Sequence, residues 1–219
     1  TILICGKSLK KLEKVKARYA AVEIFACDLV KKEECQRFTQ WIKEQFPTLN
    51  VVINNAAIVY PVNFFETEDI EEMAENEMAV NFLAPLRIIK QLDSLLCKND
   101  EATIINITTG LIYAPSAKYS IYNATKAALH SFTQVLRLQA EERNYKIIEV
   151  MFPAVDTPWH QGKPPAIAIS VQQAVRETLK GIKKGKEEIR VGGSKAFICF
   201  IKNSPCAVFT ESKRFISIV

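Results

Sequence analysis

Tyr122 and Lys126 lie four residues apart in the segment YNATK, and this pair could carry out acid–base chemistry. The apolar-periodic run that follows predicts a helix. Positions i and i+4 share one face of a helix, so the lysine can lie beside the tyrosine. A tyrosine with its ordinary pKa of about 10 is a poor base at neutral pH, and a nearby ammonium group lowers that pKa. The pair could therefore exchange a proton with a substrate, although the same spacing also fits two surface side chains.

The elements that must position this pair alternate between short apolar strands and amphipathic helices. Strands are predicted over residues 1–5, 22–29, 49–57, 102–108 and 145–154, and helices over 8–19, 31–46, 70–96 and onward from Tyr122, followed by a helix, a turn and a strand in 170–193. Apolar strands without polar alternation are typical of a parallel sheet that is buried on both faces. With the intervening helices they predict an α/β fold, a Rossmann-like doubly wound parallel sheet in three α/β/α layers.

Polar or turn-forming residues stand at the carboxyl ends of five predicted strands. In chain order they are Lys7, Asp28, Asn54 with Asn55, Thr108 with Thr109, and the stretch 153–157. In doubly wound sheets, ligands bind outside the carboxyl ends of the strands. The sequence therefore predicts one ligand site that collects residues from these ends.

Five short motifs occur in an order and spacing that resemble the short-chain dehydrogenase/reductase family, classical type. They are NNAA from Asn54, VNFLAPLRIIK around Asn81, IINITTG from Ile104, YNATKAAL from Tyr122 and PAVDT from Pro153. The resemblance implies an NAD(P)-dependent oxidoreductase that interconverts an alcohol and a carbonyl group of a small molecule. Such a reaction needs a hydride from a nicotinamide cofactor and a proton for the forming alkoxide.

The resemblance assigns catalytic roles to four residues. Tyr122 is the proton donor or acceptor, and Lys126 lowers the pKa of that tyrosine and hydrogen-bonds the nicotinamide ribose. Asn81 continues a proton relay through a bound water. Thr109 stands where the family usually has serine, and we expect its hydroxyl to donate to the substrate oxygen. Alternatively, the Thr109 hydroxyl only caps the end of a strand.

Further residues match the family's cofactor-binding positions. Asp28 is expected to accept from the adenine amino group, although it could instead be the N-cap of the following helix. Asn55 and Ala56 belong to the loop that contacts the adenine ribose, and Asn55 could simply form a turn. Pro153 opens the stretch in which Thr157 would donate to the nicotinamide carboxamide or to the diphosphate.

The choice between the two nicotinamide cofactors depends on the end of the first predicted strand. An NAD site has an acidic side chain there for the ribose 2′-hydroxyl, whereas a 2′-phosphate requires a cation. This chain has Lys7 and Ser8 at that place, and its first acidic residue is Glu13. The sequence therefore favours NADP(H), while NAD(H) stays possible.

The glycine-rich turn that holds the cofactor diphosphate in this family is not found in the sequence. The chain has seven glycines, and no T-G-x-x-x-G-x-G motif precedes Gly6. Because the segment TILIC matches the family's second strand, we expect the first βα unit, about 30 residues, to be absent from this chain. Its loss would expose two edges of the sheet. The alternative function is a catalytically inactive Rossmann-like binding or scaffold protein, or a non-functional fragment.

The composition argues against several other classes of protein. Net charge is +5, but the 29 basic and 24 acidic residues are interleaved, and no basic stripe with aromatic residues suggests nucleic-acid binding. Six cysteines without C-x-x-C spacing favour reduced thiols in a cytoplasmic protein, with neither a disulfide framework nor a metal site. No apolar run approaches the roughly 20 residues that span a bilayer, so no transmembrane segment is predicted.

The resemblance also predicts the domain organisation and the assembly. We expect residues 1–195 to form a Rossmann-like domain that is incomplete at its N-terminus. Residues 196–219 are expected to form a C-terminal extension, packed on the domain or at an interface. The family commonly forms a homodimer or homotetramer through the helices that follow Asn81 and Tyr122, and we expect the same here.

Overall fold

The computed structural model describes residues 1–192 except residues 100, 144 and 161, and the predicted extension over 196–219 therefore lies outside the described residues. The strands are β1 (Ile2–Gly6), β2 (Val22–Ala26), β3 (Val51–Asn54), β4 (Ala102–Thr109), β5 (Tyr145–Phe152), β6 (Val155–Asp156), β7 (Ile169–Ser170) and β8 (Glu188–Arg190). The helices are α1 (Leu9–Arg18), α2 (Lys32–Gln45), α3 (Ile70–Met78), α4 (Ala84–Leu96), α5 (Ser120–Gln139) and α6 (Val171–Lys183).

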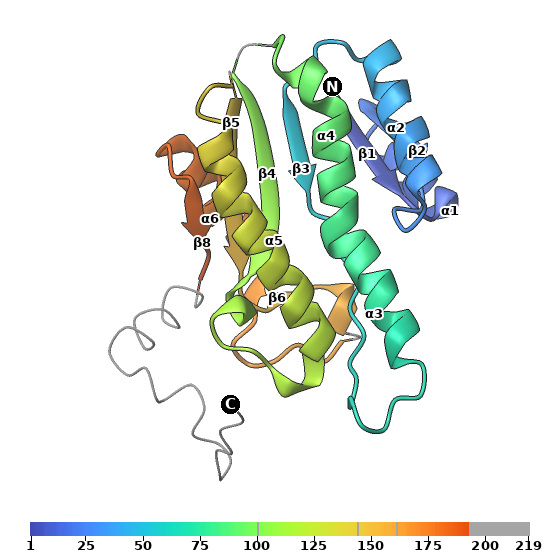
Figure 1. Cartoon of the computed structure of the whole chain (residues 1–219), viewed down its shortest axis with the longest axis vertical. Helices are drawn as coiled ribbons and strands as arrows, with labels where there is room; N and C mark the ends of the chain where they lie inside the picture. Colours follow the sequence, from blue (N-terminus) through green and yellow to red (C-terminus); the bar gives the residue numbers. More distant parts are fainter. Residues whose placement is uncertain (100, 144, 161, 193–219) are drawn as a thin grey trace.

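Helices cover both faces of the main sheet, which gives three layers (Figure 1). Successive residues of a strand point to opposite faces, and the core follows this alternation. On one face, Ile104 of β4 belongs to the same buried cluster as Leu92 of α4. On the other face, Ile105 of β4 belongs to a second cluster with Ala174 of α6. The predicted three-layer α/β fold is confirmed.

The paired strands all run parallel. The main sheet has the order β3-β4-β5-β8, and β1 and β2 form a separate two-stranded sheet. A further small pair, β6-β7, follows β5 in the chain. The longest register joins β4 to β5 and ends with Thr109 opposite Phe152. This register brings the carboxyl ends of the two central strands to the same edge, where the sequence predicts the ligand site.

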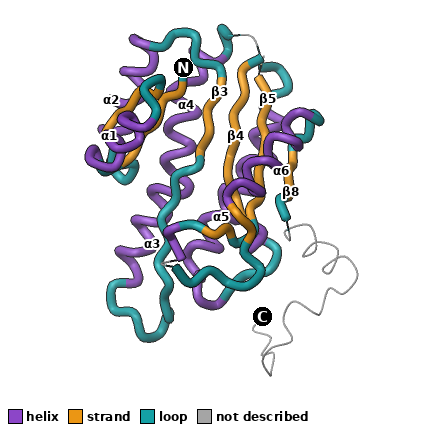
Figure 2. Tube along the Cα trace, turned by 180° about the vertical axis from the view of Figure 1, so that it is seen from behind, coloured by secondary structure: helices purple, strands orange, loops and turns teal. Residues whose placement is uncertain are grey.

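The sheet is divided between β1 and β3. In the described part of the chain, β1 pairs only with β2 and β3 pairs only with β4. Figures 1 and 2 show the two sheets side by side, with β1 neighbouring β3. Helices α2 and α4 pack together across this division, and Thr39 of α2 donates to Gln91 of α4 at 2.6 Å. Two sheet edges are therefore free of partner strands at the place that the sequence predicts, and side-chain packing holds the two sheets together.

Burial of β3 corrects one expectation from the sequence. Val52 and Asn54 are buried, whereas Val51 and Ile53 are 43% and 57% exposed. Only one face of β3 is thus covered, and the expectation that every strand is buried on both faces is wrong for this strand. It holds for the central strand β4, whose neighbouring residues Ile104 and Ile105 are both buried. No described helix is long and apolar enough to cross a membrane.

Candidate active site

Thr109 and Tyr122, the two candidate hydroxyl groups, lie in contact. Thr109 ends β4, and Tyr122 lies in the first turn of α5, which packs on β4 and β5. The Thr109 side chain lies close enough to Tyr122 to stabilise its phenolate by hydrogen bonding, which lowers the pKa of Tyr122. Thr109 Oγ1 also lies 3.3 Å from the Phe152 carbonyl oxygen and accepts from the Leu111 N–H at 3.3 Å. The alternative role of Thr109 as a strand-end cap is therefore observed, together with its contact to Tyr122.

Lys126 is buried one turn after Tyr122 on the same face of α5. Its side chain is 2% exposed, and Nζ donates to the Ile107 carbonyl oxygen at 2.8 Å. Nζ lies 5.9 Å from the centroid of the Tyr122 ring. Burial lowers the pKa of Lys126 to about 8, because the charged form loses its hydration. The predicted i, i+4 neighbourhood of the two residues is present.

The pKa of Tyr122 differs from the expectation. Burial raises it to about 12, the negative charge of Glu77 raises it further, and the hydrogen bond with Thr109 acts in the opposite direction. Loss of hydration outweighs the favourable influences on the phenolate, so the net shift of the Tyr122 pKa is upward, whereas the role of Lys126 in lowering it stays a prediction. At neutral pH Tyr122 is therefore a protonated phenol that can donate.

Asn81 lies in a π-helical turn, η1 (Ala79–Leu83), between α3 and α4. The predicted helix over 70–96 is thus interrupted at its candidate residue, and π-turns are frequent at functional sites. The Asn81 side chain is fully buried. It accepts from the Ile58 N–H at 2.9 Å, donates to the Ile58 carbonyl oxygen at 2.8 Å and donates to Thr125 Oγ1 at 3.1 Å. Asn81 therefore ties the loop after β3 to the helix that carries Tyr122.

Glu77 belongs to the same region, and the sequence-based reasoning missed it. It is fully buried in α3, four residues before Asn81. Its Oε1 accepts from the Tyr60 N–H at 2.6 Å. Burial raises the pKa of Glu77 to about 7. The available signal was its spacing from Asn81, since positions i and i+4 of a helix face the same way.

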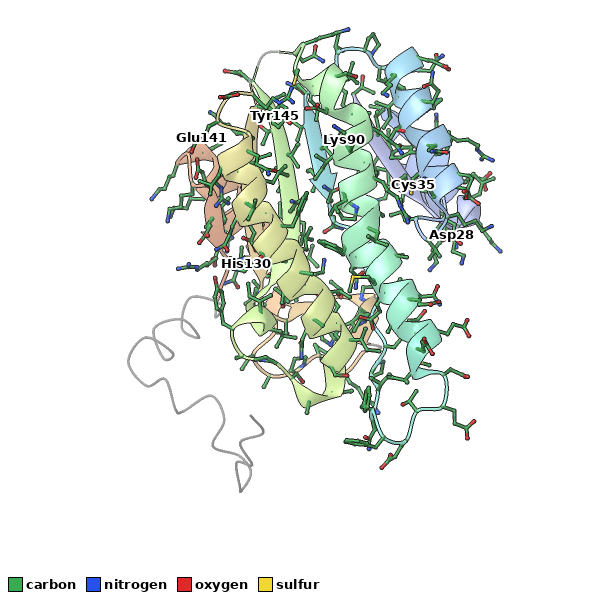
Figure 3. All side chains as sticks on the ribbon, in the orientation of Figure 1. Asp28, Cys35, Lys90, His130, Glu141 and Tyr145 are labelled. Atoms are coloured by element: carbon green, nitrogen blue, oxygen red, sulfur yellow. The ribbon has the colours of Figure 1, made fainter. Side chains whose placement is uncertain are left out.

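Lys7 and Asp28, two of the predicted cofactor-binding residues, form an ion pair at the carboxyl ends of β1 and β2. Asp28 is labelled in Figure 3. Lys7 Nζ lies 2.8 Å from Asp28 Oδ2, and the lysine side chain is 79% exposed. The pair raises the pKa of Lys7 and lowers that of Asp28. Asp28 also accepts from the Val30 N–H at 3.2 Å, whereas the N-cap of α2 is Lys31. The alternative reading of Asp28 as a helix N-cap is wrong.

The remaining predicted cofactor residues lie on loops or at a helix start. Ser8 is the N-cap of α1, and its hydroxyl accepts from the Lys11 N–H at 3.4 Å. Asn55 and Ala56 are exposed after β3. Pro153 and Thr157, after β5, are partly buried. These positions stand beyond carboxyl strand ends, as the sequence predicts.

The comparison with family models decides the identity of this fold. The model described as short chain dehydrogenase matches residues 1–167, a range that contains all four catalytic candidates. The chain belongs to the short-chain dehydrogenase family. It is accordingly an NAD(P)-dependent dehydrogenase or reductase.

Similar curated proteins carry related names. The uncharacterized oxidoreductase DltE of Bacillus subtilis is 33% identical over 193 residues, which are 86% of this chain and 77% of that protein. A fatty acyl-CoA reductase of Acinetobacter baylyi is 27% identical over 161 residues, which are 72% of this chain. The match spans only 55% of that reductase.

Solved structures of short-chain dehydrogenases share the fold. One from Burkholderia cenocepacia, in complex with NADP, has a TM-score of 0.80 at 23% identity and covers 93% of this chain and 82% of its own. One from Burkholderia phymatum, in complex with NAD, has a TM-score of 0.80 at 13% identity and covers 99% of this chain and 88% of its own. These likenesses show the fold, and the two bound cofactors differ.

A second buried polar cluster lies next to the candidate site, and the sequence analysis did not predict it. Glu149 of β5 is fully buried and accepts from Thr108 Oγ1 at 2.5 Å. Both of its oxygens lie 2.9 Å from Nδ1 of His130 on α5 (Figure 3). Thr108 precedes Thr109, so this cluster fastens the end of β4 to β5 and α5. An acidic residue inside a buried strand requires hydrogen-bond donors around it. The position of Glu149 within the apolar predicted strand is therefore the signal that could have revealed this cluster.

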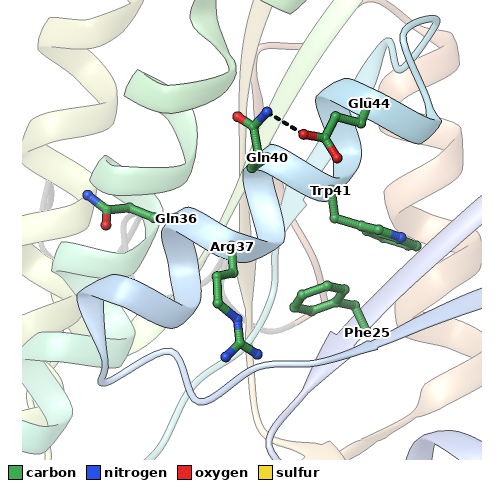
Figure 4. Close-up of a pocket in the computed structure, with 6 residues that line it drawn as sticks. All are labelled: Phe25, Gln36, Arg37, Gln40, Trp41 and Glu44. Atoms are coloured by element: carbon green, nitrogen blue, oxygen red, sulfur yellow. Dashed lines mark hydrogen bonds between the residues drawn. The ribbon is translucent and has the colours of Figure 1, made fainter.

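Two other features of the described residues lie apart from the dehydrogenase site. A surface pocket over α2 and β2 is lined by Phe25, Gln36, Arg37, Gln40, Trp41 and Glu44, where Gln40 donates to Glu44 at 2.6 Å (Figure 4). None of the candidate catalytic residues lines it. No group of three or more metal-ligating side chains gathers in the described part of the chain.

Proposed function

We propose that this chain is an NADP(H)-dependent oxidoreductase that interconverts a small-molecule alcohol and the corresponding carbonyl compound, with Tyr122 as its acid–base residue. The observation that carries the proposal is the placement of Thr109 next to Tyr122, with the buried Lys126 one turn later on the same helix. Two neighbouring hydroxyl groups can both donate hydrogen bonds to one substrate oxygen. Preorganised donors aimed at an oxygen that gains negative charge are a principal source of enzymatic rate enhancement.

The direction that these residues favour is reduction of the carbonyl group. A pKa of about 12 keeps Tyr122 protonated at neutral pH, so its phenol can donate the proton that the forming alkoxide requires. Thr109 would hold the substrate oxygen while its charge develops. Lys126, with a pKa of about 8, stays mostly charged at neutral pH and would stabilise the phenolate that remains.

Residues of this chain could contact the adenine, ribose phosphate and nicotinamide of a dinucleotide, whereas the glycine-rich turn for its diphosphate is not found in the sequence. Such a cofactor supplies or accepts the hydride of the reaction. The exposed Lys7 ammonium could turn from Asp28 to a 2′-phosphate, which supports a preference for NADP(H) over NAD(H). Asp28 and Asn55 would serve the adenine side, and Thr157 the nicotinamide or the diphosphate. The NADP complex of one structural relative agrees with this preference, and the NAD complex of another leaves NAD(H) as the competitor.

We further propose a homo-oligomer in the cytoplasm. Val135 and Leu138 on α5 are 50% and 67% exposed, and such apolar side chains suit a contact between copies. The described cysteines are all free thiols, which fits a reducing compartment: Cys5, Cys27, Cys35 and Cys97.

The test combines cofactor binding with one matched pair of variants. NADPH binding is measured by fluorescence titration, and turnover is then measured on a panel of aldehydes and ketones. Tyr122→Phe should bind NADPH like the unmodified chain and lose turnover. Tyr119→Phe removes the hydroxyl of a neighbouring tyrosine and should retain activity. Appreciable turnover in Tyr122→Phe refutes its role, and no NADPH binding at millimolar concentration would favour the inactive binding or scaffold protein.

A further inference from the structure

Glu77 is a buried carboxyl group with only one oxygen satisfied. Oε1 accepts from the backbone N–H of Tyr60 at 2.6 Å, whereas Oε2 is buried without a hydrogen-bond partner in the described part of the chain. A buried charge without a partner is costly, and a role in holding the Tyr60 loop would be served as well by a glutamine. The loss of hydration accordingly raises the pKa of Glu77 to about 7. Glu77 is thus a group that can change its charge near neutral pH.

The position of Glu77 connects it to the candidate acid–base residue. It lies in α3, which packs against α5, and its negative charge acts on Tyr122 across this contact. Of the titratable residues on these elements, Tyr122 on α5 is the one on which the Glu77 charge acts, with Lys126 one turn later on α5 and Tyr60 in the loop after β3. Lys126 Nζ donates to the Ile107 carbonyl oxygen, and Tyr60 offers Glu77 its backbone N–H. No ion pair joins Glu77 to another described residue, so its charge is felt at Tyr122 without neutralisation.

We propose that Glu77 controls the proton affinity of Tyr122 through its own change of charge, and so sets the pH range in which the site reduces carbonyl groups. The proposal rests on the proposed function, because it gives Glu77 a role in the reaction of Tyr122. When Glu77 is protonated, nothing repels the phenolate, and Tyr122 releases its proton more readily. When Glu77 is ionised, Tyr122 holds its proton more tightly, and donation to the substrate is slower. Reduction should therefore slow as pH rises through the range in which Glu77 ionises.

The first readout is the titration of Glu77 itself, which needs no turnover. Carbon-13 NMR of glutamate side-chain carboxyl groups is recorded over pH, and the Glu77 signal is identified by its loss in Glu77→Gln. The expected midpoint is near 7, against about 4.3 for an ordinary glutamate. Glutamine keeps an oxygen that can accept from the Tyr60 N–H, so the variant should fold.

The second readout is the pH profile of kcat for NADPH-dependent reduction. A change of about one unit in the Tyr122 pKa, with a Brønsted slope of about 0.5, alters the rate roughly threefold. The unmodified chain should lose that factor between pH 6 and pH 8, and Glu77→Gln should lose clearly less, since only Lys126, with a pKa of about 8, then begins to lose its charge in this range. Glu75→Gln is the matched control, because Glu75 is exposed on the same helix and carries the same charge. Its profile should equal that of the unmodified chain.

Either readout can overturn the proposal. A Glu77 signal that titrates near its ordinary value, or a Glu77→Gln profile that falls like that of the unmodified chain, refutes it. These failures differ from failure of the proposed function, in which Tyr122→Phe keeps its turnover. Loss of reduction in Glu77→Gln at every pH would also contradict a role in tuning Tyr122, since the tyrosine and its proton remain.

Discussion

Replacing Thr109 by valine tests how the candidate site stabilises a developing negative charge. Valine keeps the β-branched shape at the end of β4 and removes only the hydroxyl group. Loss of one donor to such an oxygen lowers kcat by about 100- to 1000-fold, or about 2.7–4 kcal/mol of transition-state stabilisation. The hydrogen bond from Thr109 also lowers the pKa of Tyr122, which burial raises to about 12. Removing that bond should make proton donation still slower.

The assay is NADPH consumption at saturating carbonyl substrate for the unmodified chain, Thr109→Val and Thr109→Ser. Serine keeps the hydroxyl and should stay within roughly threefold of the unmodified rate, because only a methyl group and some rotamer restriction are lost. Valine also loses the contacts to Phe152 and Leu111, each about 0.5–1.5 kcal/mol, so urea unfolding must confirm a folded variant. A folded Thr109→Val with more than about a tenth of the unmodified kcat would refute the assignment of Thr109 as an oxyanion donor.

Two further predictions concern the cofactor end and the polar cluster behind the site. Lys7→Glu places a second carboxylate beside Asp28, and this negative charge repels the 2′-phosphate. The variant should bind NADPH about tenfold or more weakly and bind NADH as the unmodified chain does. If the variant binds both cofactors as tightly as the unmodified chain, Lys7 does not contact the cofactor. Glu149→Leu leaves the Thr108 hydroxyl and the His130 ring without their partner and should lower the free energy of unfolding in urea by about 1–3 kcal/mol, with a smaller loss for Glu149→Gln, which keeps an acceptor. A Glu149→Leu variant as stable as the unmodified chain would contradict this account.

The elements could be predicted from the sequence because their signals are local. The run from Tyr122 predicts α5 from its apolar spacing, and the structure places its start at Ser120. The same spacing predicts the Tyr122–Lys126 neighbourhood, which depends only on helix geometry. The division of the sheet is also predicted, because the first strand of the chain matches the second strand of the family. In the described residues β1 pairs only with β2, and β3 pairs only with β4.

Properties that depend on burial could not be read from spacing. The raised pKa of Tyr122 results from loss of hydration, which is set by residues distant in the sequence. The spacing of Glu77 from Asn81 places both on one face of the helix, but its burial depends on the packing of α3 against α5 and on the loop that carries Tyr60, neither of which the spacing reveals. Asp28 was assigned a possible capping role from its place before a helix, whereas its partner Lys7 comes from the neighbouring strand.

The division of the sheet places the two ends of the candidate site on separately paired strands. Lys7 and Asp28 follow β1 and β2, whereas Thr109 follows β4, and no backbone ladder in the described residues crosses from one group to the other. Under the proposed function, the distance between the residues assigned to the adenine and those assigned to the reaction therefore depends on the contact between α2 and α4, where Thr39 donates to Gln91. A substitution at this contact should therefore change the affinity for a dinucleotide without altering any residue that is proposed to bind it.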